Sequence, residues 1–445
     1  MAAFRRSSLT DHLIDCRLFF LILTFISLIL FFSASSTLSD IPFSTFAPLQ
    51  SFIIGAAFQQ PRASNYRPMT TPDRDSSFPM EAENSSSSSS SPEAKMKIQL
   101  QKSKMAVCLV GGARRFEVTG PSIMENILKE YPNADLFLHS PLDENTFKLS
   151  YLKNAPKIAA VRIFEPKPIP ETESQLRVLT AKNSPNGIQG LLKYFQLVEG
   201  CLTMIRTYQQ LNNFTYDWVV RTRVDGYWNA PLRPDYFVSG HYVVPSGSSY
   251  GGLNDRFGVG DLNTSTVALS RLGLIPNLDA AGFLQLNSET AFKAQLTTMG
   301  VPFERMRLPF CIVTERQYEF PPGRFGVPVA AMSSRGPLSG TKCRPCRVAC
   351  EGECVERVMV WLEKGWSWTN WENGTMGLCN ASGEWEMGWE KIYEEMVGAE
   401  MGDLSWKIQK MKMSECVQGF NQMKRRSGIW DSPNGENICK LGFRT

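Results

Sequence analysis

The residues best suited to chemistry gather at the end of one short apolar segment, within residues 216–228. Residues 218–220 have the aromatic and β-branched side chains of a buried strand, and Arg221, Arg223 and Asp225 follow at once. Ligands of open α/β sheets bind at the carboxyl ends of the strands. Two guanidinium groups suit a phosphate or carboxylate, and a carboxylate suits a divalent metal or a sugar hydroxyl. The alternative is a structural Arg–Asp ion pair at the end of the strand, and this stretch alone favours neither interpretation.

A second set of candidate residues follows the first predicted strand, residues 105–110. Gly111 and Gly112 would let the backbone approach a nucleotide closely. Arg114 and the arginine after it supply charge that suits a diphosphate. A Gly-Gly pair alone is also a frequent turn, so its specificity is low.

A third set of polar residues surrounds a glycine- and serine-rich loop at residues 246–252. Asp255 and Asp261 lie in the segment that follows it, residues 253–261, and form a second group of carboxylates. We interpret the loop as a substrate lid over a polar floor. A surface loop with turn-forming Asn-Asp and Gly-Asp pairs is the alternative.

The pattern of apolar residues predicts the elements that must position these side chains. Strands are expected at residues 105–110, 135–139, 159–164, 218–220, 241–244 and 309–314, and helices at 122–130, 188–211 and 288–299. The first helix is expected to begin directly after Pro121. Strands that alternate with helices imply βαβ units and a mainly parallel sheet.

This order of elements, with GGARRF, YDWVVRTRVD and LNDRFGVGD in turn, resembles that of GT-A-type glycosyltransferases. It is similar to bacterial proteins of lipopolysaccharide and capsule synthesis and to related plant Golgi-type proteins, over about residues 105–315. The resemblance implies a GT-A-like, Rossmann-like catalytic domain at residues 105–340, a nucleotide-sugar donor and a glycan acceptor. In GT-A enzymes an Asp-x-Asp-type motif holds a divalent metal. Asp225 falls at that motif, but Arg223 stands where its first aspartate would be.

The resemblance also implies roles for individual residues. Asp225, with or without Mn²⁺ or Mg²⁺, and the two arginines Arg221 and Arg223 would bind the donor diphosphate. Because Arg223 replaces a metal ligand, the arginines could neutralise the diphosphate themselves. Transfer also needs a base that deprotonates the acceptor hydroxyl. Asp255 is the first candidate for this base, and Glu289 is the second.

Composition and charge indicate an ordinary globular protein. The chain has 445 residues, of which 43% are apolar and 20% charged, with a formal net charge of +4. The small charge and the lack of a basic groove sequence disfavour nucleic-acid binding. Only three histidines occur, at positions 12, 139 and 241, so carboxylates and arginines must carry most of any chemistry.

The N-terminal segment predicts the compartment. Residues 1–17 carry three arginines and are expected to be a cytoplasmic tail before a single transmembrane signal-anchor at residues 18–35. This type II topology would place the C-terminus in the Golgi or endomembrane lumen. A cleaved signal peptide is the alternative. Residues 36–104 are rich in Ser and Pro and are expected to form a disordered stem. Glycosylation sequons consistent with a lumenal glycoprotein begin at Asn84, Asn213, Asn263, Asn373 and Asn380.

Cysteine crowding marks residues 341–445, which hold seven of the eleven cysteines and are predicted to form a small C-terminal domain. The spacing is compatible with disulfides or zinc, and an oxidising lumen favours disulfides. Seven is odd, so one cysteine should pair with Cys108, Cys201 or Cys311 or stay free. The tryptophan-rich residues 366–371 would either stack on sugar rings or fill a small core.

Three classes of function are compatible with these patterns. The first is a type II glycosyltransferase of the Golgi or endomembrane lumen. The second is a non-catalytic lumenal carbohydrate-binding or scaffold protein on a GT-A-like fold, which the missing first aspartate favours. The third is a membrane-anchored, disulfide-rich interaction module of the cell surface. Donor binding separates the first two, and a plasma-membrane location without nucleotide affinity would indicate the third.

Overall fold

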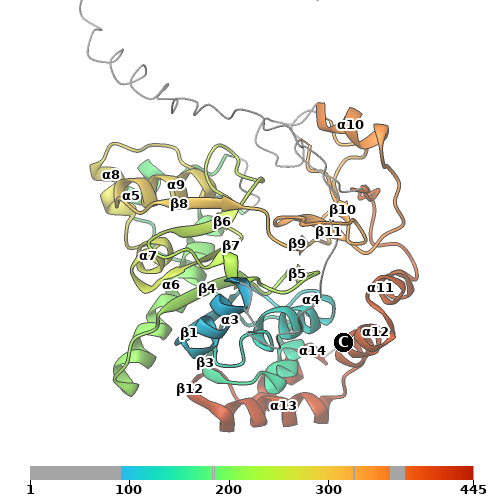
Figure 1. Ribbon diagram of the computed structural model, residues 1–445, viewed down its shortest axis with the longest axis horizontal. Helices are drawn as coiled ribbons and strands as arrows, with labels where there is room; N and C mark the ends of the chain where they lie inside the picture. Colours follow the sequence, from blue (N-terminus) through green and yellow to red (C-terminus); the bar gives the residue numbers. More distant parts are fainter. Residues whose placement is uncertain (1–91, 183, 185, 324–325, 361–375, 444–445) are drawn as a thin grey trace, which may run out of the picture. The chain divides into compact units, whose positions relative to one another are not determined.

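The computed structural model describes residues 92–182, 184, 186–323, 326–360 and 376–443 (Figure 1). The predicted cytoplasmic tail, the signal-anchor, the stem up to residue 91 and the tryptophan-rich residues 366–371 lie outside these ranges. Helix α3, Pro92–Lys102, begins within the segment predicted as stem. No helix in the described ranges is both long enough and apolar enough to cross a bilayer.

Eight strands form the main sheet, in the order β12-β3-β2-β1-β4-β7-β6-β8. They are β1 Met105–Val110, β2 Asp135–Pro141, β3 Ile158–Phe164, β4 Trp218–Arg223, β6 Tyr242–Pro245, β7 Phe257–Asp261, β8 Phe303–Met306 and β12 Ser427–Asp431. Only β7 runs antiparallel to its neighbours β4 and β6, and the other described pairs are parallel. The predicted mainly parallel α/β sheet is therefore confirmed.

A second, four-stranded sheet has the order β10-β11-β9-β5. Its strands are β5 Gly226–Trp228, β9 Phe310–Val313, β10 Ala330–Ala331 and β11 Thr341–Arg344. Only two residues separate β4 of the main sheet from β5 of this sheet. The Arg223–Asp225 region therefore lies where the two sheets meet.

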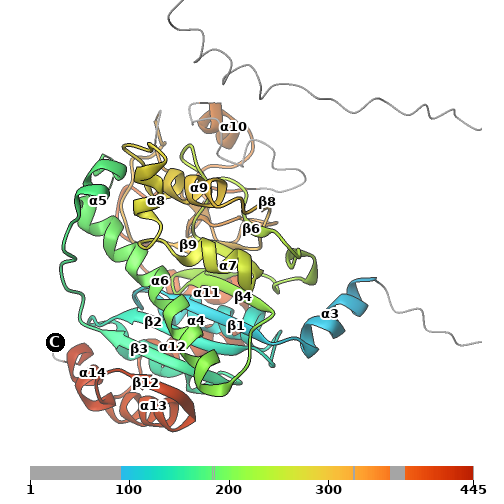
Figure 2. The same cartoon turned by 90° about the vertical axis from the view of Figure 1, so that its left-hand side faces the viewer.

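Helices cover both faces of the main sheet. The described helices besides α3 are α4 Phe116–Ile123, α5 Glu173–Val178, α6 Gly187–Asn212, α7 Leu262–Leu269, α8 Ile275–Ala280, α9 Ser288–Thr298, α10 Glu353–Val360, α11 Trp389–Val397, α12 Ala399–Gln409, α13 Met413–Arg426 and α14 Gly435–Gly442. Of these, α10 and α11 pack against the second sheet. A π-helix at Met124–Leu128 and 3-10 helices at Thr146–Asn154 and Pro234–Tyr236 complete the set. Figure 2 shows β12, α13 and α14 together at the β3 edge of the sheet.

Alternation along β1 separates two cores, because successive side chains of a strand point to opposite faces. Val107 and Leu109 belong to a core with α4, the 3-10 helix at Thr146–Asn154, α13 and α14. Ala106 and Cys108 belong to a core with α6, α7 and α9. The long helix α6 packs on this second face of the sheet.

The predicted start of the first helix is wrong. Helix α4 begins at Phe116 and contains Pro121, although proline lacks the N–H that an internal helical position needs. All eight residues of α4 are buried, so tertiary packing outweighs the local preference. After the proline the chain continues as a π-helix from Met124, the wider turn that proteins use as a local bulge.

Disulfides hold the described part of the chain, as predicted. The pairs are Cys108–Cys201, Cys311–Cys343, Cys346–Cys379, Cys350–Cys354 and Cys416–Cys439. The odd cysteine of the C-terminal segment is Cys343, which pairs with Cys311. Cys108–Cys201 joins β1 to α6. Residues 341–445 also contribute β11 to the second sheet and β12 to the main sheet.

Candidate functional site

A cavity of about 630 Å³ lies at the carboxyl ends of β1 to β4, where ligands of open α/β sheets bind. Its volume is in the usual range for a ligand site. The strand side is lined by Val110, Gly111, Gly112, Arg114, Pro141, Leu142, Asp143, Phe164, Pro166, Arg223 and Asp225. The opposite wall is the N-terminal part of α6, with Asn186, Gln189, Gly190, Lys193, Tyr194, Gln196 and Leu197.

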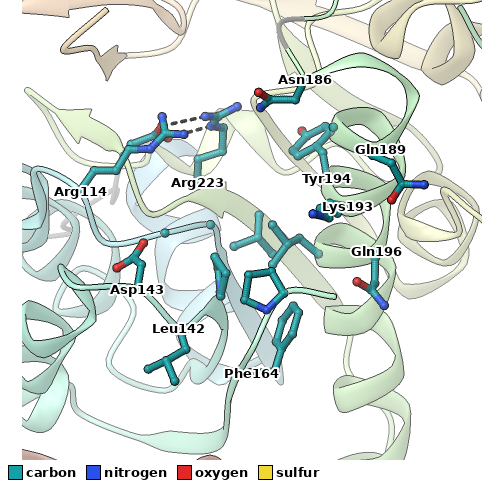
Figure 3. Close-up of a pocket in the computed structure, with 18 residues that line it drawn as sticks. Arg114, Leu142, Asp143, Phe164, Asn186, Gln189, Lys193, Tyr194, Gln196 and Arg223 are labelled. Atoms are coloured by element: carbon teal, nitrogen blue, oxygen red, sulfur yellow. Dashed lines mark hydrogen bonds and ion pairs between the residues drawn. The ribbon is translucent and has the colours of Figure 1, made fainter. Parts of the chain in front are cut away.

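The cavity has a cationic end and an apolar end. Arg114 and Arg223 lie together at one end, while Leu142 and Phe164 lie at the other (Figure 3). Lys193 reaches the cavity from α6 between them. Within the described residues the Lys193 ammonium group has no ion-pair partner. This arrangement suits a ligand with an anionic part and an apolar or aromatic part.

Arg223 and Asp225 form a two-pronged ion pair at the cationic end. Arg223 donates from Nε to Oδ1 and from Nη2 to Oδ2 of Asp225, each at 2.7 Å. Arg114 Nη1 lies 3.6 Å from Oδ2 of the same carboxylate. Burial opposes ionisation of Asp225, but the charges of Arg223 and Arg114 outweigh it and hold the pKa of Asp225 well below its usual range. Asp225 therefore stays a carboxylate between two guanidinium groups.

The glycine turn after β1 shapes the neighbouring wall. Gly111 has φ +121°, a conformation that L side chains rarely adopt. A Cβ added at Gly112 would lie 2.9 Å from Oδ2 of Asp143, so glycine permits the turn to approach this carboxylate. The structure thus shows Gly112 close to the Asp143 side chain, and the close approach to a nucleotide stays a prediction.

Asp143 is a cavity residue that the sequence reasoning missed. It follows β2 by two residues, the kind of strand-end position that singled out Asp225. Its carboxylate accepts hydrogen bonds from the Thr146 hydroxyl at 3.0 Å and the Asn145 N–H at 2.9 Å. Burial raises the pKa of Asp143. Asp143 is placed to accept a hydrogen bond from a ligand hydroxyl.

Arg221 does not line the cavity. Its side chain is 1% exposed, and Nη2 donates to the Asp255 carbonyl at 2.5 Å while Nη1 donates to the Tyr194 hydroxyl at 3.2 Å. Tyr194 donates in turn to the same carbonyl at 2.6 Å. Arg221 therefore supports the cavity wall from behind, through the tyrosine.

The two candidate bases also lie outside the cavity lining. The buried Asp255 carboxylate accepts a hydrogen bond from the Ser288 hydroxyl and lies 3.8 Å from Arg271 Nη2. Burial and the nearby Asp255 raise the pKa of the half-buried Glu289 to about 8. Asp255 and Glu289 thus share one charged region beside α9.

The predicted grouping of Asp255 with Asp261 is not formed. Asp261 ends β7 and caps α7, where it accepts a hydrogen bond from the Thr264 N–H at 2.9 Å. The predicted lid packs against α9: a Cβ added at Gly252 would lie 2.0 Å from the Glu289 carbonyl oxygen. Strand β7 runs between the two aspartates, which separates them.

Residues 100–445 match a family described as a domain of unknown function, DUF7796. This chain belongs to the DUF7796 family. The matched segment contains both sheets and all ten cysteines of the disulfides described above.

No curated protein matches the chain. Among solved structures, mouse xyloside xylosyltransferase 1 in its apo form is similar with a TM-score of 0.30 and 13% identity, over 46% of this chain and 84% of that one. These values lie below the range in which a structural likeness indicates a shared activity.

The divalent metal implied for Asp225 does not fit the residues of this DUF7796 chain. Both Asp225 oxygens already accept hydrogen bonds from Arg223, and Arg114 adds a second positive charge nearby. Among the described residues, no group of three or more His, Cys, Asp or Glu side chains is arranged to hold a metal ion. Mg²⁺ usually binds through one or two carboxylates together with waters and substrate phosphates, and two guanidinium groups beside this carboxylate would repel the ion.

Proposed function

We propose that this protein is a nucleotide-sugar-dependent glycosyltransferase of the Golgi or endomembrane lumen that acts on a glycan acceptor. The observation that carries the proposal is the cavity at the strand ends, with guanidinium groups at one end and Leu142 and Phe164 at the other. A nucleoside diphosphate has the matching halves, an anionic diphosphate and an aromatic base. The cavity volume of about 630 Å³ is ample for such a ligand.

The donor diphosphate would bind at Arg114 and Arg223. Glycosyl transfer releases a diphosphate, so positive charge must be in place where negative charge develops. Arg114 is 61% exposed and is held only by a 3.6 Å ion pair with Asp225, while Arg223 is held in one orientation by two hydrogen bonds to the same carboxylate. Lys193 adds a third cation from the opposite wall. Gly111 and Gly112 form the turn beside this diphosphate.

The nucleoside would occupy the apolar end. The Phe164 ring offers an apolar face to a base, and Leu142 lies at the same end. Asp143 lies between this end and the arginines and is placed to accept a hydrogen bond from a ribose hydroxyl.

Glu289 is the better candidate for the base that receives the acceptor proton. A pKa of about 8 makes the Glu289 carboxylate a stronger base than an ordinary glutamate, and the fraction of molecules that carry this carboxylate grows as the pH rises toward 8. The Asp255 carboxylate is already engaged by Ser288 and Arg271. Asp255 would then act on the reaction by raising the pKa of Glu289.

The cysteines support the proposed compartment. Disulfides persist in the secretory pathway and are rare in the cytosol. Five disulfides among the described residues therefore favour a lumenal location, which a type II anchor at residues 18–35 would produce.

A non-catalytic lumenal carbohydrate-binding or scaffold protein is the second candidate. It is favoured by Arg223, which stands in the place of the first aspartate of a metal-binding motif and occupies both oxygens of Asp225. A protein of this kind could keep the fold and the cavity without turnover.

A binding and hydrolysis screen separates the two candidates. The full chain in mild detergent is titrated with a panel of uridine, guanosine and cytidine nucleotide sugars, with and without Mn²⁺, and release of the nucleoside diphosphate is followed. Saturable binding with turnover supports the transferase. Binding of a donor without turnover supports the second candidate, and no binding of any nucleotide sugar contradicts the proposal.

A further inference from the structure

Both carboxylate oxygens of Asp225, a residue of the cavity lining, are already engaged by arginine side chains. A carboxylate binds Mg²⁺ or Mn²⁺ through lone pairs on its oxygens. Oδ1 and Oδ2 both accept from Arg223 at 2.7 Å, and Oδ2 also faces Arg114 at 3.6 Å. A cation at either oxygen would lie beside two guanidinium groups, and the like charges would repel it.

The backbone also holds the carboxylate in this place. The Val313 N–H donates to the Asp225 carbonyl at 2.9 Å, and Thr119 Oγ1 donates to the Val224 carbonyl at 2.7 Å. On the other side the Val224 N–H donates to the Val110 carbonyl at 3.0 Å. Both sheets and α4 therefore fix the backbone of residues 224–225, and the Asp225 carboxylate could turn toward a metal only by giving up its two hydrogen bonds from Arg223.

The surroundings carry an excess of positive charge. Arg114, Arg223 and Lys193 line the cavity together with two acidic residues, Asp225 and Asp143, which gives three basic side chains against two acidic ones. Behind them, burial and the neighbouring Arg256 and Arg223 hold the pKa of Lys342 well below its usual range. Part of this lowering comes from the two arginines, which means that a further cation is disfavoured beside them.

We infer that Asp225 is a positioning residue for Arg223 and not a metal ligand, so that the cavity binds a diphosphate directly through guanidinium groups. Arginine has five N–H donors, and two of those of Arg223 point at Asp225. The remaining three, with those of Arg114, are available for phosphate oxygens. The inference rests on the proposed function, because it assumes that the anionic half of the ligand is a diphosphate.

Inorganic pyrophosphate is the probe that tests this inference, because it has the diphosphate without nucleoside or sugar. The full chain is titrated calorimetrically with pyrophosphate in EDTA, and again with Mn²⁺. We expect saturable binding in EDTA. Arg223→Gln should weaken it by roughly tenfold or more, the usual effect of losing a charge-assisted hydrogen bond. Asp225→Asn should keep binding within about threefold, because it removes a negative charge near the anion as well as the anchor.

The chain offers a matched control. Arg233 pairs with Asp235 in the same two-residue spacing, through Nε at 3.1 Å and through Nη2, but this pair is exposed and does not line the cavity. Arg233→Gln should leave pyrophosphate binding unchanged. This control shows whether the loss of an Arg-x-Asp ion pair outside the cavity changes pyrophosphate binding.

Two outcomes overturn the inference in distinguishable ways. Pyrophosphate binding that requires Mn²⁺ and is abolished by Asp225→Asn would make Asp225 a metal ligand and leave the proposed function standing. No binding in either condition would remove the diphosphate site and the proposed function with it. If Asp225→Asn does not fold, electron paramagnetic resonance of Mn²⁺ with the unsubstituted chain decides the point. We expect the free Mn²⁺ signal to persist, and its loss would contradict the inference.

Discussion

Arg221 and Tyr194 share a hydrogen bond of 3.2 Å that joins the buried interior to the wall of the cavity. Arg221 is paired in register with Cys108, and Cys108 is bonded to Cys201 of α6. Tyr194 lies on α6 and lines the cavity. The Cys108–Cys201 disulfide and the buried Arg221 guanidinium group thus both hold α6 in place relative to the strand ends.

Removing the Tyr194 hydroxyl should destabilise the fold. Tyr194→Phe keeps the ring but takes a partner from buried Arg221 and from the Asp255 carbonyl, which should lower the free energy of unfolding by about 1–3 kcal/mol. Chemical denaturation measures the change. Tyr208→Phe is the control, because the structure gives its hydroxyl no hydrogen bond within the described residues. Equal stabilities of the two variants would contradict the supporting role of Tyr194.

Close packing of α6 on β2 should make Gly200 intolerant of a side chain. A Cβ there would lie 2.1 Å from Cε1 of His139, whose Nδ1 donates to the Leu197 carbonyl at 2.8 Å. Gly200→Ala should therefore lower the free energy of unfolding by about 1–3 kcal/mol, the usual effect of overpacking. Gly383→Ala, where a Cβ meets nothing within 4 Å, should have little effect. A Gly200→Ala protein as stable as the control would show that β2 and α6 separate readily.

Glu289 should make stability depend on pH in a defined direction. Its pKa of about 8 in the folded state is above the ordinary value of about 4.3 in the unfolded chain, so its contribution is complete below about pH 4 and is lost as the pH rises toward 8. Glu289→Gln has no ionisable group at this position, so the variant does not lose this stability as the pH rises. The stability of the variant relative to the original chain should rise by up to about 1.4 kcal/mol per pH unit between pH 5 and 8.

The test compares unfolding curves of the two proteins across this pH range. Other titrating groups contribute equally to both and cancel in the difference. A difference in stability that does not change with pH would show that Glu289 is ionised like a surface carboxylate, and would remove it as the candidate base.

Disulfide loop length predicts an order of stabilities. Cys416–Cys439 closes a loop across 23 residues and holds α13 to α14, whereas Cys350–Cys354 spans only 4. Replacing both cysteines of a pair by serine should lower the free energy of unfolding by about 3 kcal/mol for the first pair and about 2 kcal/mol for the second. Thermal or chemical unfolding of the two double variants checks the order, and a reversed order would contradict it.

Much of the site follows from one rule, that ligands meet parallel strands at their carboxyl ends. Arg223 and Asp225 follow from this rule, and they line one cavity with Gly111, Gly112 and Arg114, which come directly after β1. Arg221 differs from Arg223 by two positions, so both point to the same face of β4, but Arg223 ends the strand while Arg221 lies beneath α6. The spacing of the residues cannot show which of the two arginines lines the cavity, because that depends on how far α6 extends over the sheet.

The opposite wall of the cavity was not predictable from the chain. The apolar stripe of α6 indicates which side packs on the sheet, but Asn186, Gln189 and Lys193 reach the cavity because the helix begins beyond the strand ends. The helix start at Phe116 was also missed, because burial of all of α4 outweighs the proline signal. In both cases tertiary packing determines the position of the helix, which the local pattern of residues does not specify.

Binding of a nucleoside diphosphate to the original chain and to Arg223→Gln tests the central claim most directly. Full-length protein, Arg223→Gln and the control Arg233→Gln are titrated calorimetrically with uridine and guanosine diphosphates at one salt concentration. The account predicts saturable binding of at least one nucleotide by the original chain and by Arg233→Gln, and roughly tenfold or weaker binding by Arg223→Gln. Equal affinity of all three proteins, or no binding by any of them, would contradict it.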